Sequence, residues 1–391
     1  MDLTPGSQLH GFTVRSSEPL SEIDGTAYVL DHDESGAQLL YLANDDTNKA
    51  FSIAFKTPPA DDTGVFHILE HSVLCGSDKF PVKEPFVNLL KSSMQTFLNA
   101  MTFPDKTMYP VASTNDQDLL NLTDVYLDAV LHPAIYRKRA IFEQEGWHYE
   151  LSGDVEAAAG DSVAGDAVAA TEAADGSASL VLNGVVYNEM KGALSDPNSV
   201  LYDELQAALF PDTAYRFESG GTPRAIPDLT YEQFLEEHRR HYRLDNSYLT
   251  LYGDLDADAM LAFLDERYLS PVADEQAAAT SFDAEGAPLA PHPLEKQAPV
   301  VALGVTRPMV PAPENACAGL GYVIGDAGER TRIVAVDILL DAIMGSNEAP
   351  LKRALPDAGP AAHAQAFLAD SVLPPLAVMQ LRGLQGDGAP R

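Results

Sequence analysis

The order of two hydrophobic patterns along the chain constrains its fold more than any other sequence feature. In the first 60 residues, short apolar runs alternate with turn residues, which predicts antiparallel strands at 26–30, 38–42 and 50–55. Farther on, apolar residues recur at helical spacing, most clearly from residue 116 to the His-Pro pair at 132–133. Strands followed by helices predict an α+β protein, an α/β roll in which an antiparallel sheet is covered by helices.

Two stretches of biased composition divide the 391 residues. Residues 153–179 consist almost entirely of Ala, Gly, Asp, Glu, Ser and Val without an aromatic residue, which predicts a solvated low-complexity insertion. Residues 270–298 are rich in Pro, Ala and acidic residues and are predicted to be an interdomain linker. We therefore expect one complete domain over 1–269. A partial second domain of similar type, opening with a strand at 299–305, is expected over 299–391.

The chain is strongly acidic. Its 25 Lys and Arg residues against 58 Asp and Glu give a formal charge of −33, which repels phosphate backbones and anionic membranes. Binding to nucleic acid or to a membrane surface is therefore not expected. Two explanations of the acidity stay open, an adaptation of the whole surface to high salt and an acidic cavity that attracts cationic substrates.

The cysteine count and the absence of targeting signals indicate the compartment. Only two cysteines occur, Cys75 and Cys317, without a CxxC pair, so a disulfide framework is not expected. The N-terminus has neither a basic nor an apolar leader region, and no apolar stretch reaches about 18 residues. The sequence therefore predicts a cytoplasmic protein.

One short motif carries metal chemistry. Residues 67–71 read HILEH, the HxxEH pattern. On a helix, His67 and His71 lie on one face and can bind the same ion, while Glu70 lies beside them as a proton acceptor for a water molecule. Two histidines leave a catalytic zinc one protein ligand short, and Glu189 in the run VYNEMKG is the predicted third.

The segments around these residues resemble a known family. The matching runs are HILEHSVLCGSDKFPVKEPF, FLNAMTFPDKTMYPV, DVYLDAVLHP, EQEGWHYEL and GVVYNEMKG, followed by SGGTPRAIPDLTYEQFLEEHRRHY and NSYLTLYGDL. They are similar, in this order, to the inverzincin peptidases of the pitrilysin/insulinase superfamily, most of all to its presequence-protease branch. The resemblance implies one Zn²⁺ per chain, with His67, His71 and Glu189 as ligands and Glu70 as general base.

The resemblance also implies a peptide-binding surface. Asn99 and Ala100 are expected on an edge strand that holds an extended peptide by β-augmentation. Four apolar residues resemble the pocket for the side chain next to the scissile bond, although packing in the core explains them equally well. They are Leu74, Phe86, Val87 and Leu90.

Other chemically suggestive residues are given structural roles. Cys75 is interpreted as a buried thiol at the end of the motif helix, because it lies too far along the axis to share the ion. His238 and His241 are interpreted as a solvated surface pair on a charged helix. Glu145 is interpreted as structural, and glycines 220–221 as a loop that binds no phosphate.

The sequence thus predicts a zinc-dependent metalloendopeptidase that degrades short or unfolded peptides. The alternative is a non-catalytic peptide-binding or scaffold member of the family, or an inactive fragment of such a peptidase. In the family, two bowl-shaped halves close around the peptide, and nothing in this sequence matches the distal half. The resemblance therefore implies that a C-terminal half or a second chain closes the active-site chamber.

Overall fold

The computed structural model describes residues 3–82, 89, 91–152, 179–278, 290–302, 304, 306–308, 316–358, 361–370 and 372–384. The predicted insertion at 153–179 lies outside these residues except for Ser179. No described helix is both long enough and apolar enough to cross a bilayer.

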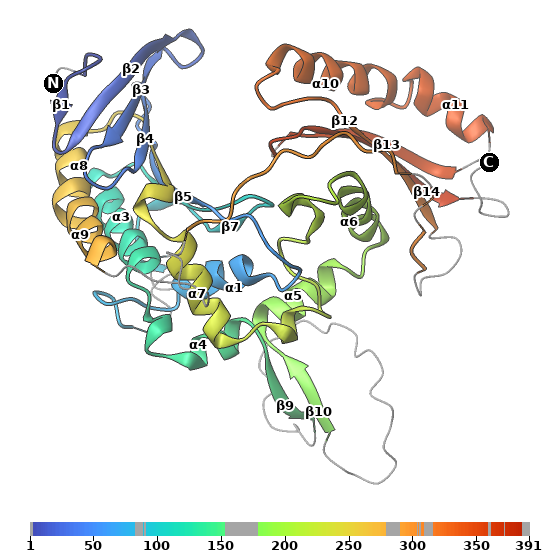
Figure 1. The fold of residues 1–391 in the computed structure, drawn as a ribbon. Helices are drawn as coiled ribbons and strands as arrows, with labels where there is room; N and C mark the ends of the chain where they lie inside the picture. Colours follow the sequence, from blue (N-terminus) through green and yellow to red (C-terminus); the bar gives the residue numbers. More distant parts are fainter. Residues whose placement is uncertain are drawn as a thin grey trace.

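A nine-stranded sheet organises the first part of the chain (Figure 1). Its strands run in the order β1-β2-β3-β4-β11-β5-β8-β6, and β7 also pairs with β8. Only β4 and β11 are parallel; the other pairs are antiparallel. The strands are β1 (Gln8–Leu9), β2 (Phe12–Leu20), β3 (Gly25–His32), β4 (Gln38–Ala43), β5 (Lys49–Lys56), β6 (Gln95–Leu98), β7 (Met101–Thr102), β8 (Lys106–Ser113) and β11 (Ser247–Tyr252).

Helices pack on this sheet around one large core, which confirms the predicted α+β architecture. The longest, α3, begins after Asn115, whose side chain accepts a hydrogen bond from the backbone N–H of Asp118 at 2.9 Å. A short π-helical stretch (Asp265–Leu269) joins α8 to α9. The helices are α1 (Val65–Val73), α3 (Asp116–Leu131), α4 (Arg139–Glu145), α5 (Val185–Ala193), α6 (Pro197–Leu209), α7 (Tyr231–His241), α8 (Ala257–Leu264) and α9 (Ser270–Ala278).

A three-stranded antiparallel sheet of order β12-β14-β13 forms the second unit. Figure 1 shows α10 and α11 over one of its faces and α6 of the first unit next to the other. Gly319 of β12 permits this approach, because a Cβ there would lie 2.8 Å from a methyl group of Leu205. The elements are β12 (Cys317–Val323), α10 (Arg330–Met344), α11 (Pro350–Ala358), β13 (Ala361–Ala369) and β14 (Leu376–Leu384).

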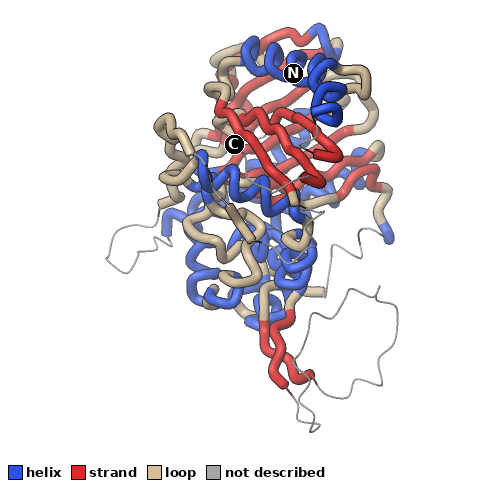
Figure 2. Tube along the Cα trace, turned by 90° about the vertical axis from the view of Figure 1, so that its right-hand side faces the viewer, coloured by secondary structure: helices blue, strands red, loops and turns tan. Residues whose placement is uncertain are grey.

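A separate hairpin extends from the body of the molecule, as Figure 2 shows. It pairs β9 (His148–Ser152) with β10 (Ser179–Asn183) in antiparallel register. In this hairpin Ser152 pairs with Ser179, the two residues that flank 153–178 in the sequence.

Two sequence predictions near the domain junction differ from the structure. The predicted linker at 270–298 begins with nine residues of helix α9, and Val272 of this helix belongs to the main core. Among 299–305, the described residues 299–302 and 304 form no strand. Val301 is 87% exposed, so this apolar residue is neither paired in a strand nor buried in a core.

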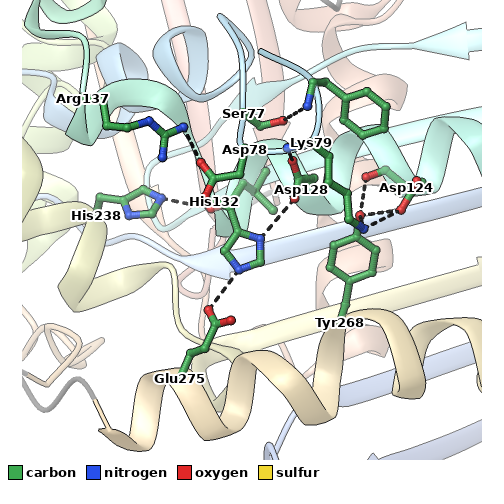
Figure 3. Close-up of polar contacts among 12 residues, drawn as sticks. Ser77, Asp78, Lys79, Asp124, Asp128, His132, Arg137, His238, Tyr268 and Glu275 are labelled. Carbon is green, nitrogen blue, oxygen red and sulfur yellow. Dashed lines mark hydrogen bonds and ion pairs between the residues drawn. The ribbon is translucent and has the colours of Figure 1, made fainter.

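A polar network connects the loop after α1 to two helices (Figure 3). Asp128 of α3 accepts hydrogen bonds from the backbone N–H of Lys79 at 2.8 Å and from His132 Nδ1 at 3.2 Å. The other ring nitrogen of His132 lies 3.2 Å from Glu275 of α9. The hydrogen bonds to Asp128 and Glu275 raise the pKa of His132 although its partial burial opposes this.

This network predicts a pH-dependent stability difference between the parent and His132→Gln. Because the folded-state pKa of His132 is raised, its contribution is complete below the unfolded value and disappears as the pH rises through the folded value. Urea unfolding should therefore show a larger loss of stability in the variant at about pH 6 than at about pH 9. An equal loss at both pH values would refute the ionic role of His132.

Candidate functional site: a His-His-Glu cluster beside a second carboxylate

Helix α1 places the HxxEH residues at the edge of a cavity. The helix is buried along most of its length, including His67 and Glu70 at 9% and 8% exposure, while His71 is half-buried. Its apolar residues Ile68 and Leu69 are fully buried in the main core. The two imidazoles therefore project from a rigid element, with ring centroids 5.0 Å apart.

Glu189 reaches the two histidines from helix α5. Its Oε2 lies 3.7 Å from His67 Nε2 and 3.6 Å from His71 Nε2. All three ligand atoms lie within 4.8 Å of one another. A tetrahedral zinc ion with bonds of about 2.0–2.2 Å separates its ligand atoms by roughly 3.3–3.6 Å. The three side chains therefore fit a zinc ion, with a fourth position left open.

The second nitrogen of each ring is held by another residue. His67 Nδ1 lies 3.2 Å from the carbonyl oxygen of Gly220, which can only accept, so Nδ1 carries the proton and Nε2 faces Glu189. His71 Nδ1 lies 3.4 Å from Glu145 Oε2. Such outer contacts fix the tautomer and orientation of metal-binding histidines. Neither contact was foreseen from the sequence, which suggested only structural roles for Glu145 and for the glycine loop.

Gly64 allows the Gly220 carbonyl to approach α1. This residue precedes the helix with φ +66°, and a Cβ there would lie 2.4 Å from the Gly220 oxygen. Gly221 also has a positive φ, +88°, and packs against Gly64. Both glycines are thus required by the close contact between the loop and the start of α1.

We therefore expect Gly64→Ala to destabilise the protein by about 1–3 kcal/mol, because the new Cβ meets backbone at a left-handed residue. Gly192→Ala is the matched control, since a Cβ at this helical position of α5 meets nothing within 4 Å. For Gly192→Ala we expect the free energy of unfolding to increase by about 0.4–1 kcal/mol. Urea unfolding measures both values, and equal effects would contradict the packing argument.

Glu70 is oriented by a residue that sequence reasoning missed. Its Oε2 accepts a hydrogen bond of 2.8 Å from Thr102 Oγ1 on β7. Thr102 also pairs with Thr107 of β8, so the hydroxyl is fixed to the sheet. Glu70 is not part of the three-ligand cluster. It therefore borders the cluster with an oriented carboxylate, as a general base requires.

These residues line a cavity of about 820 Å³. Its lining contains four carboxylates and no Lys or Arg, so it favours cationic over anionic ligands. The lining residues are His67, Glu70, His71, Leu74, Cys75, Asn99, Ala100, Met101, Thr102, Phe103, Glu145, Glu189, Met190, Glu218, Ser219 and Gly220.

The acidic groups shift the pKa of one predicted ligand. Burial by itself would lower the pKa of His71, but the hydrogen bond to Glu145 and the nearby charges of Glu70, Glu145 and Glu189 raise it. Burial likewise opposes ionisation of Glu145, yet its hydrogen bonds to His71 and Gln144 leave its pKa below the usual value. Both shifts favour the charged pair, a carboxylate facing an imidazolium.

The predicted peptide-binding residues are only partly described. Asn99 and Ala100 lie between β6 and β7, at the edge of the large sheet, and line the cavity. Leu74 is half-buried and also lines it. Phe86, Val87 and Leu90 lie outside the described residues. The assignment of these residues to a substrate pocket stays a prediction.

The interpretation of the two α7 histidines as a solvated pair was wrong. His238 and His241 are 4% and 0% exposed. His238 contacts the carbonyl of Val130 at 3.0 Å and the hydroxyl of Tyr136 at 2.7 Å, and burial lowers its pKa to about 3. Cys75 follows α1 and is half-buried, with Sγ 3.5 Å from Glu145 Oε1.

The comparisons with known proteins agree on one family. Residues 228–379 match the family described as "Peptidase M16 inactive domain". This range contains none of the predicted zinc ligands, nor Glu70. The chain is 43% identical to Protein HypA of Clostridium perfringens, over 89% of this chain and 33% of that protein. It is 47% identical to the Arabidopsis thaliana presequence protease 1, chloroplastic/mitochondrial, over 66% of this chain and 22% of that one.

Solved structures show the same fold. Pitrilysin superposes with a TM-score of 0.58 at 14% identity, over 97% of this chain and 36% of that chain. The crystal structure of a peptidase M16 inactive domain from Pseudomonas fluorescens superposes with a TM-score of 0.60 at 14% identity. The match covers 92% of this chain and 74% of that chain.

The fold and the sequence similarities together define a member of the M16 peptidase superfamily, to which this chain belongs. Within that superfamily it lies near the presequence-protease branch. The chain spans about a third or less of the length of these curated relatives.

Proposed function

We propose that the chain carries the zinc-binding catalytic site of a metalloendopeptidase that cleaves short or unfolded peptides. The observation that carries this proposal is the convergence of His67, His71 and Glu189 beside the oriented carboxylate of Glu70. Zinc bound there supplies a Lewis acid that polarises the scissile carbonyl and lowers the pKa of water.

The side chains of this chain then have distinct roles. Glu70 accepts the proton of the attacking water and delivers it to the leaving amine, while Thr102 holds one of its oxygens in place. The sheet edge at Asn99 and Ala100 borders the cavity, where an extended peptide can pair with it. Glu145 keeps the His71 ring directed at the metal.

We further propose that full activity needs additional polypeptide, supplied by a longer chain or a second one. The curated relatives are about three times longer or more. An open site exposes the reaction to bulk water, and the loss of one oxyanion donor typically lowers a rate about 100- to 1,000-fold. Slow peptide turnover by the isolated chain, accelerated by the remaining portion of a relative, would support this proposal.

The decisive experiment combines zinc content with peptide turnover. Chelation should abolish the hydrolysis of an unstructured fluorogenic peptide, and Zn²⁺ should restore it. His71→Ala should lose about one zinc equivalent together with turnover. Cys75 lines the same cavity but is not part of the ligand cluster, so Cys75→Ser should keep both its zinc and its turnover. Unchanged zinc in His71→Ala, or turnover that resists chelation, would contradict the proposed function.

A further inference from the structure

A second cluster of potential metal ligands lies away from the cavity. It consists of Glu237 and His241, one turn apart on α7, and His292 from the irregular segment 290–302. Glu237 Oε2 lies 3.3 Å from His241 Nε2 and 3.3 Å from His292 Nε2. The three ligand atoms lie within 4.8 Å of one another, as in the first cluster.

These separations match the edges of a zinc coordination tetrahedron. Ligand atoms at about 2.0–2.2 Å from a tetrahedral ion are roughly 3.3–3.6 Å apart. Two imidazole nitrogens and one carboxylate oxygen are a donor set that suits Zn²⁺. By distance, this cluster fits a zinc ion at least as closely as the cluster at His67 and His71 does.

The hydrogen bonds around His241 direct a free lone pair at the carboxylate. His241 Nδ1 lies 2.9 Å from the carbonyl oxygen of Lys56, which can only accept, so Nδ1 is protonated. The backbone N–H of His292 points at Nε2 from 3.4 Å, so Nε2 is an acceptor. This contact is long for a hydrogen bond, and a metal ion would replace it.

The remaining atoms of the cluster are buried and lack good hydrogen bonds. Glu237 Oε2 and His292 Nε2 have no hydrogen-bond partner among the described residues. Arg240 Nε lies 3.3 Å from the other oxygen, Oε1, which leaves Oε2 for the two rings. The Glu237 oxygen thus faces an acceptor nitrogen of His241 and, at 3.3 Å, the Nε2 of His292, whose tautomer is fixed by no other contact among the described residues. A cation bound between the three atoms would stabilise this arrangement.

We propose that Glu237, His241 and His292 form a second zinc site with three protein ligands. It joins α7, part of the main core, to the segment that leads toward the second sheet. The same segment is already attached there by the Arg240 guanidinium, which donates to the carbonyl of Ala290 at 3.3 Å. The ion would fix the path by which the chain leaves the first unit.

Zinc counting in a His71→Ala background isolates this site from the cavity. After dialysis against Zn²⁺ and removal of free metal, we expect about two equivalents in the parent and about one in His71→Ala. His71→Ala/His292→Ala should retain none. His292 is accessible at the surface, with 30% of its side chain exposed, so this substitution spares the core. In the same His71→Ala background, Glu237→Gln keeps the shape of the side chain and should also remove the remaining zinc equivalent.

His132→Gln provides a matched control. His132 also follows a carboxylate by four residues and contacts another from a separate helix, but its two nitrogens face different carboxylates. The two nitrogens of this one ring cannot both bind the same ion, so His132 is not expected to hold zinc. His132→Gln should therefore retain both zinc equivalents. The comparison of His71→Ala with His71→Ala/His292→Ala depends on neither peptidase activity nor the proposed function, because both variants lack the cavity ligand His71.

Cobalt gives an independent readout. Co²⁺ added to His71→Ala should produce the visible absorption of a tetrahedral site, and His71→Ala/His292→Ala should lack it. Circular dichroism verifies that the variants are folded. Equal zinc and cobalt binding with and without His292 in folded protein would overturn the second site and leave Glu237 as an ion-pair partner only.

Discussion

Glu70→Gln is expected to lower peptide turnover by about 100- to 10,000-fold without changing the zinc content. The amide keeps the size of the side chain and can still contact Thr102, but it cannot accept the proton of the attacking water. Turnover is measured with a fluorogenic peptide, on the longer assembly if the isolated chain is slow. The zinc content of the same sample is measured by mass spectrometry.

Thr102→Val is a graded companion to this variant. It removes the hydroxyl that orients Glu70 but leaves the carboxylate, so its loss of turnover should be clearly smaller than that of Glu70→Gln. If Glu70→Gln turned over peptide as fast as the parent, Glu70 would not be the base. If it also lost zinc, Glu70 would be holding the metal rather than moving a proton.

Glu145→Gln is expected to weaken zinc binding at the cavity by about 10- to 100-fold. The substitution removes the charge that faces His71 Nδ1 at 3.4 Å and loosens the orientation of the ring. Competition with a chelator of known affinity measures the dissociation constant, in a His292→Ala background so that only the cavity contributes.

Glu143→Gln is the control on the same helix. Glu143 is about half exposed and pairs with Arg139 at 3.0 Å rather than with the cluster. Its substitution should leave the zinc affinity within about twofold. If both variants weakened zinc binding to a similar extent, the loss of any negative charge on α4 would have this effect. Glu145 would then have no particular role.

The sequence anticipated what depends on local spacing. HxxEH at residues 67–71 specifies one helix face, so the juxtaposition of His67, His71 and Glu70 follows from helical geometry alone. The proximity of Glu189 came instead from its resemblance to a family motif. Its separation along the chain carries no geometric information, because 153–178 lies between.

Contacts between distant segments were not predictable in this way. Thr102, Glu145 and the Gly220 carbonyl reach the site from separate elements, and nothing in their own segments marks the residue they will face. The α7 histidines were misread because adjacent arginines made the helix look solvated. Those arginines lie more exposed while His238 and His241 turn into the core.

The contact between α6 and the second sheet has a mechanical consequence. Leu205 of α6 packs against Gly319, and only three residues separate α6 from α5, which carries Glu189. His67 and His71 are anchored on α1 in the main core, whereas the side chain of Glu189 is 53% exposed. We therefore expect a shift of the second sheet to move Glu189, one of the proposed ligands, relative to His67 and His71. Zinc binding at the proposed site would then depend on the position of the second unit, through two consecutive helices.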